Sequence, residues 1–314
     1  MMFLHDKPMP PSSPHCSPHR WHGLELHGLT LHFAGATGRA SSRGFPGEIW
    51  RGLLGQALSR AVCSYPHANC HNCVLLSGCA YPALFKPLDA TRLPPFWPHG
   101  WQAADRGWHV GLRWLGKQDY ALSQWLSALA RPSTRGEKST EQHFLGAPVR
   151  LEKASHALTG ETLWTPHRQW QNLPQPLPLP APLPEEAATQ GCRVRFLTPL
   201  VSKHEGDPLY GALHTRVQRL VQAHGDGQTL SRPDRPWQCR VLGQQPLKKQ
   251  LARRPLQGTL WEVALTDIAP EALTLLTVGQ ELHAGGQTTS GCGQYQLLPL
   301  AATTEKTGTT STSY

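Results

Sequence analysis

Residues 282–295 read LHAGGQTTSGCGQY, close to the end of a chain of 314 residues. Gly285, Gly286, Gly291 and Gly293 fall within nine positions, and such a density permits positive φ angles and close approach of a partner to the backbone. Backbone N–H groups beside Gln287, Thr288 and Thr289 would form a concavity of the kind that binds phosphate. A glycine-rich β-hairpin or bulge explains the same residues without a ligand, so this stretch alone leaves both interpretations open.

Apolar periodicity around this stretch predicts a domain in which strands and helices alternate. Strand signals occur at 192–200 and 258–265, apolar residues recur at 273–278, and residues 280–298 enclose the glycine-rich loop. Residues 209–221 repeat apolar positions every three or four residues, which indicates a helix with Arg216 and Arg219 on its polar side.

The first half of the chain has the same kind of pattern. Residues 24–33 alternate as a strand does, 49–62 and 120–129 have helical spacing, and 144–151 resemble a further strand. Both halves therefore match the split βαβ arrangement of a ferredoxin-like fold. The fold class expected is α+β, with two ferredoxin-like domains in tandem and a small cysteine-rich insertion in the first.

Composition divides the chain into segments. Residues 173–184 alternate Pro with Leu, Gln or Ala, which is typical of an extended, semi-rigid spacer; a proline-rich ligand for a partner's aromatic groove is the alternative. The expected organisation is a disordered arm (1–19), a first domain (20–164) with its insertion at about 63–85, the linker (165–190), a second domain (191–300) and a disordered tail (301–314).

The charge balance favours a polyanionic partner. Lys and Arg outnumber Asp and Glu by 30 to 21, giving a net charge of +9 and a pI near 9.3. Nucleic acid and an anionic membrane surface both fit such an excess. The sequence has no apolar run of about 18 residues and no apolar stretch typical of a secretory signal, so we expect a cytoplasmic protein without a membrane partner.

Four of the eight cysteines, Cys63, Cys70, Cys73 and Cys79, are spaced C-x6-C-x2-C-x5-C. Four thiolates around one tetrahedral ion are typical of structural zinc, which has no open position for chemistry. An iron–sulfur cluster and unliganded thiols are the alternatives, and His67 or His71 could replace one cysteine. A reducing compartment makes disulfides the weaker interpretation.

Several motifs, in order along the chain, resemble one family. They are IWRGLLGQAL at 49–58, CAYPALF at 79–85, FLTPLVSKHEG at 196–206, LHTRVQRL at 213–220 and the glycine-rich loop. Together they resemble the CRISPR-associated endoribonucleases that cut precursor repeat RNA, within the RAMP superfamily. The resemblance touches both halves, and some members carry a cysteine-bearing insertion like the one here.

The resemblance implies an enzyme of CRISPR antiviral defence in which a ribose 2′-OH attacks the adjacent phosphate, with no cofactor for catalysis. His32, Arg39 and Arg43 are then the catalytic candidates. The sequence departs from the family pattern at 34–47, where members often have a histidine and this chain has none. A catalytically inactive RAMP-type subunit that binds RNA in an effector complex is therefore the alternative. A zinc-dependent DNA-binding regulator is weaker, since no helix-turn-helix pattern accompanies the cysteines.

The expected partners are repeat RNA and other subunits of a CRISPR effector complex. The residues predicted to bind RNA are basic or belong to the glycine-rich loop: Arg51, Lys203, Lys248, Lys249, Arg253, Arg254, Gly285, Gly286, Gln287, Thr288, Thr289, Gly291 and Gly293. The basic run at 248–254 is alternatively a solvated loop, and Arg51 a solvated helix residue. An aromatic-rich stretch at 96–114 fits base stacking or, more simply, a core.

Overall fold

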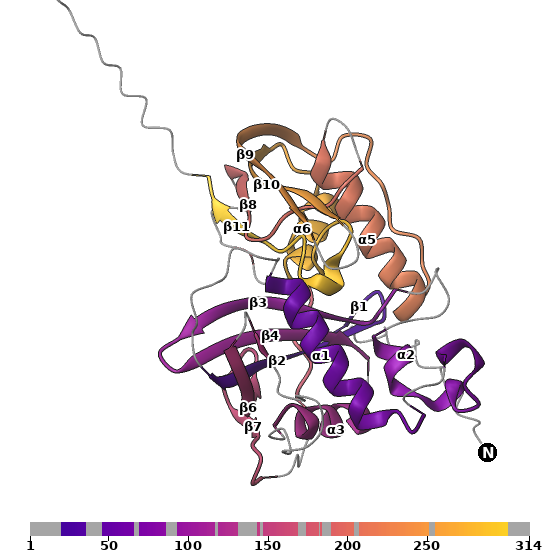
Figure 1. Ribbon diagram of the computed structural model, residues 1–314. Coiled ribbons are helices and arrows are strands. Elements are labelled where there is room, and N and C mark those ends of the chain that lie inside the picture. Colours follow the sequence, from indigo (N-terminus) through magenta and orange to yellow (C-terminus); the bar gives the residue numbers. More distant parts are fainter. Residues whose placement is uncertain are drawn as a thin grey trace, which may run out of the picture.

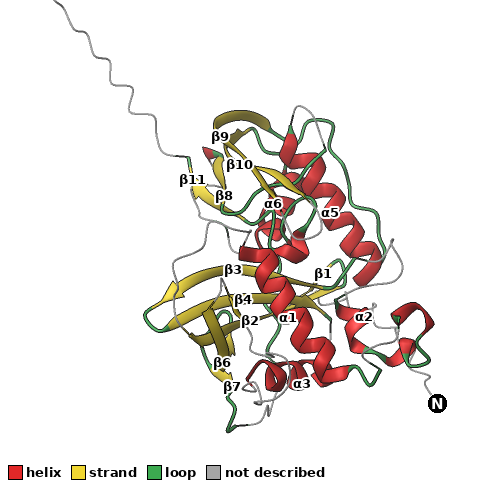
Figure 2. Ribbon diagram, in the orientation of Figure 1, coloured by secondary structure: helices red, strands yellow, loops and turns green. Residues whose placement is uncertain are grey.

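The computed structural model describes residues 20–35, 46–65, 69–85, 93–116, 119–130, 143–144, 147–168, 174–181, 183, 190–203, 207–250 and 255–300. Within these ranges the chain forms two antiparallel sheets, each with helices packed on it (Figures 1 and 2). The predicted N-terminal arm and C-terminal tail lie outside the described residues.

The first domain has the order of a ferredoxin-like unit. Along the chain come β2 (Leu24–Gly35), α1 (Pro46–Val62), β3 (Phe96–Ala104), β4 (Gly107–Leu115), α3 (Asp119–Ala130) and β6 (Ala147–His156). The sheet order β3-β4-β2-β6 places the first and third of these strands side by side at its centre. The short strands β1 (Arg20–Trp21), β5 (His143–Phe144) and β7 (Thr162–Trp164) extend the sheet, and α2 (Ala80–Leu84) follows the cysteine-rich segment.

The second domain repeats this topology. Its elements are β8 (Cys192–Phe196), α5 (Pro208–His224), β9 (Gln238–Gln250), β10 (Pro255–Thr266), α6 (Pro270–Leu282) and β11 (Tyr295–Pro299). The sheet order is β11-β8-β10-β9, with every pair antiparallel. The predicted α+β class with two ferredoxin-like domains in tandem is therefore confirmed by the connectivity itself.

The two faces of β2 have different neighbours because successive residues of a strand point to opposite sides. Leu29, Leu31 and Phe33 pack in one core with residues of α1 and α3. Leu24 and Leu26 belong to a second core that is built mostly from the C-terminal domain. Further along the same face, Thr30 and His32 are only half buried. One face of the first sheet is therefore apolar where the second domain covers it and polar beyond that edge.

The proline-rich segment, described at residues 174–181 and 183, is packed on the first sheet. Leu177 and Leu179 are buried in the core shared with the C-terminal domain. The Leu177 N–H donates to Leu26 O over 2.7 Å, and His156 Nε2 lies 3.0 Å from Gln175 O. The segment docks because its alternate leucines are buried. The prolines between them have no N–H group and cannot form a ladder of backbone hydrogen bonds.

Some local expectations differ from the structure. The strand expected over 192–200 ends at Phe196, and the apolar positions at 273–278 lie within α6. The aromatic-rich stretch forms the β3–β4 hairpin, in which Phe96, Trp97 and Trp114 are buried, so the core interpretation is confirmed for them. The basic stretch before residue 250 is the strand β9 and not a loop, because it pairs with β10 along its whole length.

Candidate functional site

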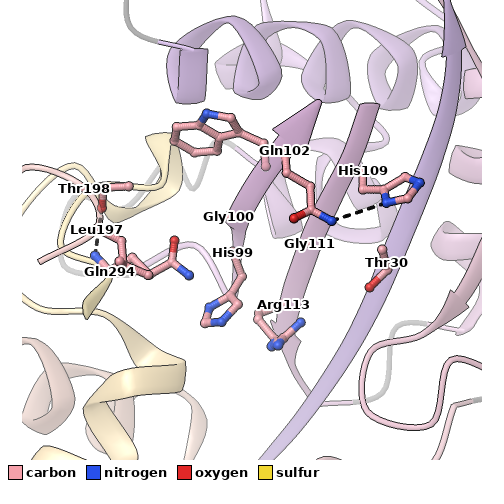
Figure 3. Close-up of a pocket in the computed structure, with 11 residues that line it drawn as sticks. Thr30, His99, Gly100, Gln102, His109, Gly111, Arg113, Leu197, Thr198 and Gln294 are labelled. Carbon is pink, nitrogen blue, oxygen red and sulfur yellow. Dashed lines mark hydrogen bonds between the residues drawn. The ribbon is translucent and has the colours of Figure 1, made fainter. Parts of the chain in front are cut away.

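A pocket of about 370 Å³ opens between the two domains, on the face of the first sheet opposite the helices (Figure 3). Its floor comes from β2, β3 and β4, and its other wall from the C-terminal domain. We call it the interdomain pocket; its lining residues are Thr30, His99, Gly100, Trp101, Gln102, His109, Gly111, Arg113, Leu197, Thr198 and Gln294.

His32, the first catalytic candidate from the sequence, lies beside this pocket. It is the register partner of the pocket residue His109, and the two rings meet edge to face at 4.4 Å between centroids. His32 Nε2 lies 2.8 Å from Ser155 Oγ on β6. Burial, with His109 and Lys153 nearby, lowers the pKa of His32 to about 4, so its ring is neutral at pH 7. Arg39 and Arg43 lie outside the described residues.

A second pair of histidines joins the two domains at the pocket. His99 Nδ1, on β3, lies 3.0 Å from Nε2 of His283, which follows α6. His283 is fully buried, has a φ of 64°, and places Nδ1 3.1 Å from Cys292 O. Burial holds the pKa of both histidines well below the usual range. Beside them, Arg113 Nε donates to Glu281 Oε2 over 2.7 Å.

The glycine-rich loop lines a different cavity, of about 430 Å³, which we call the glycine-loop cavity. It is basic on the side of α5, where Arg216 and Arg219 lie, and Lys203 stands at its edge. The other lining residues are Leu93, Pro94, Val201, Ser202, Ala212, Thr215, Gly285, Gly286, Gln287, Thr288 and Thr289. The structure therefore brings the predicted Lys203 together with five of the predicted loop residues.

Arg216 is unusual among these cations because it is buried. Only 5% of the residue is exposed, and its Nη2 has no hydrogen-bond partner among the residues that the structure describes. Nε donates to Leu282 O over a long 3.4 Å. Burial, with Arg219 nearby, lowers its pKa to about 9, and no carboxylate is paired with it in the described ranges. A buried cation without an anion is destabilising, so this position favours binding of a negatively charged group.

The four glycines of the loop have different roles. Gly291 is buried with a φ of +74°, and an added Cβ would lie 2.8 Å from the Trp101 ring of the first domain. Gly285 and Gly293 also have positive φ, and a Cβ there would meet the carbonyls of Val201 and Ala284. Gly286 is exposed, and a Cβ would make only ordinary contact with Val201. The loop is therefore exposed at Gly286 and packed against Trp101 of the first domain at Gly291.

The other predicted RNA-binding residues are spread over both domains. Lys248 is exposed near the end of β9, and Lys249 follows it in the same strand; Arg253 and Arg254 lie outside the described residues. Arg51, on α1, is half buried with its guanidinium over the Phe85 ring at 5.1 Å. That contact ties Phe85, which directly follows α2, to α1, and this is a packing role.

The four cysteines proposed as zinc ligands all lie in the described insertion, and their thiols are free and half buried. Cys70 and Cys73 flank a tight turn in which the Cys73 N–H donates to Cys70 O over 3.2 Å. Within the described residues, no group of three or more His, Cys, Asp or Glu is close enough to hold a metal ion. The spacing suits zinc, but the thiols are not assembled into one coordination shell, and zinc stays a prediction.

Sequence reasoning missed most of the interdomain pocket. His99, His109 and Arg113 lie in the stretch that was interpreted through its aromatic residues, and Glu281 was not singled out. One signal was present: alternation along 96–114 places polar side chains on one face of a hairpin whose other face is aromatic.

No helix in the described ranges is long and apolar enough to cross a membrane.

Comparisons with known proteins give one family model and several solved structures. A family model, AF_1859_N, described as an N-terminal domain, matches residues 26–175. No curated protein matches the chain. Among solved structures, a RAMP protein described as binding different RNA substrates shares 13% identity, with 87% of this chain and 99% of that chain covered and a TM-score of 0.44.

Two further structures are a Cas6 protein and a Cas6-related protein. Thermus thermophilus Cas6 shares 17% identity, with 88% of this chain and 99% of that chain covered and a TM-score of 0.45. A Cas6-related protein from Pyrococcus furiosus shares 11%, with 87% and 98% covered and a TM-score of 0.42. At these identities the likeness of this chain to the three structures concerns the fold alone.

Proposed function

We propose that this protein binds CRISPR repeat RNA and cuts it by attack of a ribose 2′-OH on the adjacent phosphate, without a catalytic metal ion. The observation that carries the RNA-binding part is Arg216. A buried guanidinium with an unpaired Nη2 lines the cavity formed by the glycine-rich loop. A phosphate oxygen supplies both the acceptor and the negative charge that Arg216 lacks.

Charge and shape support RNA as the source of that phosphate. Lys203 and Arg219 add positive charge around the same cavity, and the whole chain carries +9. Exposed Lys248, far along β9, extends the basic surface toward the hairpin end. Proteins bind A-form RNA mostly through its phosphates and its shape. Several separated cations fit this mode of binding better than one deep pocket would.

Cleavage needs a proton acceptor for the 2′-OH and positive charge at the phosphorane. His32 stays the candidate from sequence for the first role, with Arg39 and Arg43 for the second. A neutral His32 can accept a proton, but a pKa of about 4 makes it a weak base. If His32 acts, His32→Ala should lower the cleavage rate by about 10²–10⁴-fold.

The alternative is an RNA-binding subunit without activity, in a complex with other CRISPR proteins. One observation favours it: His32 Nε2 is already within hydrogen-bond distance of Ser155 Oγ, and the loop that follows β2 contains no histidine. In that case the interdomain pocket would contact RNA without chemistry, and the glycine-loop cavity would bind phosphate as before.

One gel distinguishes these functions. Purified protein is incubated in EDTA with its cognate repeat RNA, and with the same RNA carrying a single 2′-deoxyribose at the cut site. The proposal expects one discrete cut, a 2′,3′-cyclic phosphate upstream and a 5′-OH downstream, with the deoxy RNA bound but intact. Tight binding without a cut supports the inactive subunit. Cleavage of the deoxy RNA at that site refutes the mechanism, and absence of binding refutes both functions.

A further inference from the structure

The hydrogen bonds that link His99 and His283 fix the positions of their protons. A carbonyl oxygen only accepts, so His283 Nδ1 carries the proton that is donated to Cys292 O over 3.1 Å. Because burial keeps His283 neutral, its Nε2 is unprotonated and accepts from His99 Nδ1 over 3.0 Å. Neutral His99 therefore has its proton on Nδ1 and a lone pair on Nε2.

Charged groups of both signs surround that lone pair: burial and Arg113 lower the pKa of His99, whereas Glu281 supplies a negative charge. His99 lines the interdomain pocket, and its Nε2 lies 3.9 Å from Glu281 Oε2. Arg113 Nε holds the same carboxylate oxygen at 2.7 Å, which orients it. If His99 takes up a proton, the imidazolium forms next to a fixed negative charge. Arg113 opposes a positive charge on His99, and Arg216 opposes one on His283.

His32 differs from His99 in that no ion pair joins it to a carboxylate within the described ranges. Its Nε2 lies against Ser155 Oγ, and the charged or titratable groups that act on it are His109 and Lys153, which oppose a positive ring. His283, the partner of His99, has a φ of 64°. This backbone conformation costs energy in a residue other than glycine, and such conformations recur at functional sites. The surrounding packing maintains this strain at the residue that orients His99.

We propose that His99 is the proton acceptor of the RNA cleavage reaction, that His283 is the residue that positions its ring, and that Glu281 stabilises its protonated form. The inference rests on the proposed endoribonuclease function and names its base. It replaces the histidine that the loop after β2 lacks with one contributed by β3, beside the C-terminal domain.

The reaction balances with these groups. The 2′ oxygen forms a bond to phosphorus while its proton passes to His99 Nε2. The bond between phosphorus and the 5′ oxygen breaks, and that oxygen takes a proton from water. The upstream product retains a 2′,3′-cyclic phosphodiester, and His99 returns its proton to solvent. Arg113, also in the pocket lining, supplies positive charge for the phosphorane.

The test compares isosteric variants in single-turnover cleavage of repeat RNA by the full-length chain. In His99→Asn the amide nitrogen replaces Nδ1 as donor to His283, but the base is gone, so the rate should fall about 10²–10⁴-fold with RNA affinity unchanged. In His283→Gln the amide oxygen still accepts from His99 Nδ1, so the loss should stay below about 10-fold. Glu281→Gln should move the acidic limb of the pH–rate profile to lower pH and reduce the plateau, because the imidazolium loses its counter-charge.

Two results would overturn the assignment without touching the proposed function: full activity in His99→Asn, or a large loss confined to His32→Ala. A wild-type chain that binds RNA but never cuts it overturns the assignment together with the endoribonuclease function. Histidine-ring ¹⁵N spectra give a readout that does not need activity. They should show the Nδ1–H tautomer for the ring signal that His99→Asn removes, and an Nε2–H tautomer there would contradict the proton positions.

Discussion

The guanidinium of Arg216, on α5, lies over the indole ring of Trp97, on β3, with 5.4 Å between its central carbon and the ring centroid. Trp97 in turn donates from Nε1 to Glu281 O over 3.0 Å. The contact joins the two ferredoxin-like domains, and Arg216 also lines the glycine-loop cavity. One residue therefore takes part both in domain docking and in the surface that we propose binds phosphate.

Replacing this arginine should separate the two roles. Arg216→Met keeps much of the side-chain volume and removes a buried charge that has no anion, so stability should stay within about 1 kcal/mol of wild type or rise. RNA affinity should fall about 10- to 100-fold, the cost of one charge-assisted hydrogen bond. Thermal unfolding and equilibrium RNA binding at fixed salt measure the two effects.

Arg232→Met is the matched control, because it removes the same charge from a guanidinium that lies over Tyr210, outside the cavity lining. The RNA affinity of Arg232→Met should change by less than about 3-fold, because Arg232 is not expected to contact a phosphate. If Arg216→Met instead lowers stability and leaves affinity at the wild-type value, Arg216 is a packing residue and the phosphate assignment is wrong.

The glycines of the loop give a second test in which two neighbouring substitutions should behave differently. Gly286→Val adds a side chain at an exposed position with room for it, so the fold should survive while RNA is kept from the backbone. Gly291→Val combines a φ of +74° with a close contact to Trp101, and should cost about 1–3 kcal/mol of unfolding free energy. Normal RNA binding by a folded Gly286→Val protein would exclude the loop backbone as a phosphate contact.

The basic run at the β9–β10 hairpin should act through salt-dependent binding. Neutralising Lys248, Lys249, Arg253 and Arg254 together should reduce the slope of log affinity against log salt by about three to four, close to one for each phosphate that is no longer neutralised. The fall in affinity should be similar for unrelated RNA sequences, since phosphates carry no sequence information. A slope equal to that of wild type, measured between about 50 and 200 mM salt, would show that the run is only solvated.

Acid should weaken the folded state through its buried histidines. The pKa values of His32, His99 and His283 are all lowered by burial, to about 4 for His32, so the unfolded chain binds more protons than the folded chain below about pH 6.5. Stability is then fully present above about pH 6.5 and decreases as the pH falls toward the folded pKa values. Urea unfolding at several pH values should show this slope, and His283→Gln should make it shallower.

A structural feature could be predicted from the sequence when the interactions that specify it are local along the chain. Strands and helices follow from local periodicity, and β2, α1, α3 and α5 lie where the apolar spacing indicates. Asp207 explains one boundary well: its Oδ1 accepts from the N–H groups of Leu209 and Tyr210, and Pro208 begins α5. Such signals lie within a few residues of the feature that they specify.

The site depends on contacts between distant segments, which periodicity does not encode. Arg216 was assigned to the polar side of its helix, yet it is buried because the first domain packs on that side. His99 and His283 are 184 residues apart, and nothing in either local sequence indicates that their rings meet. The glycine-rich loop was found from composition, but the docking of Gly291 under Trp101 is again a contact between domains.

The cysteine-rich insertion is the last test, and packing explains why a metal ion is expected there. Among the described residues of 63–79 no side chain is buried, and Val74 is 86% exposed. The short 3₁₀ helices Cys70–Asn72 and Leu76–Gly78 have no core of their own, and isolated turns of this length are marginal. Small segments without a core are commonly held by a structural metal, and Cys63, Cys70, Cys73 and Cys79 are each half buried rather than exposed.

Protein purified without added metal should therefore contain about one zinc per chain. Cys73→Ser should lose the zinc and expose the insertion to proteolysis within 63–79, because the ion, and not apolar burial, would order it. Cys239→Ser is the control, since Cys239 is exposed on β9 and should leave both zinc content and cleavage pattern at wild-type values. Metal analysis that finds no zinc, with all four insertion thiols titrating freely and the proteolysis pattern the same in Cys73→Ser, would show that the spacing is coincidental.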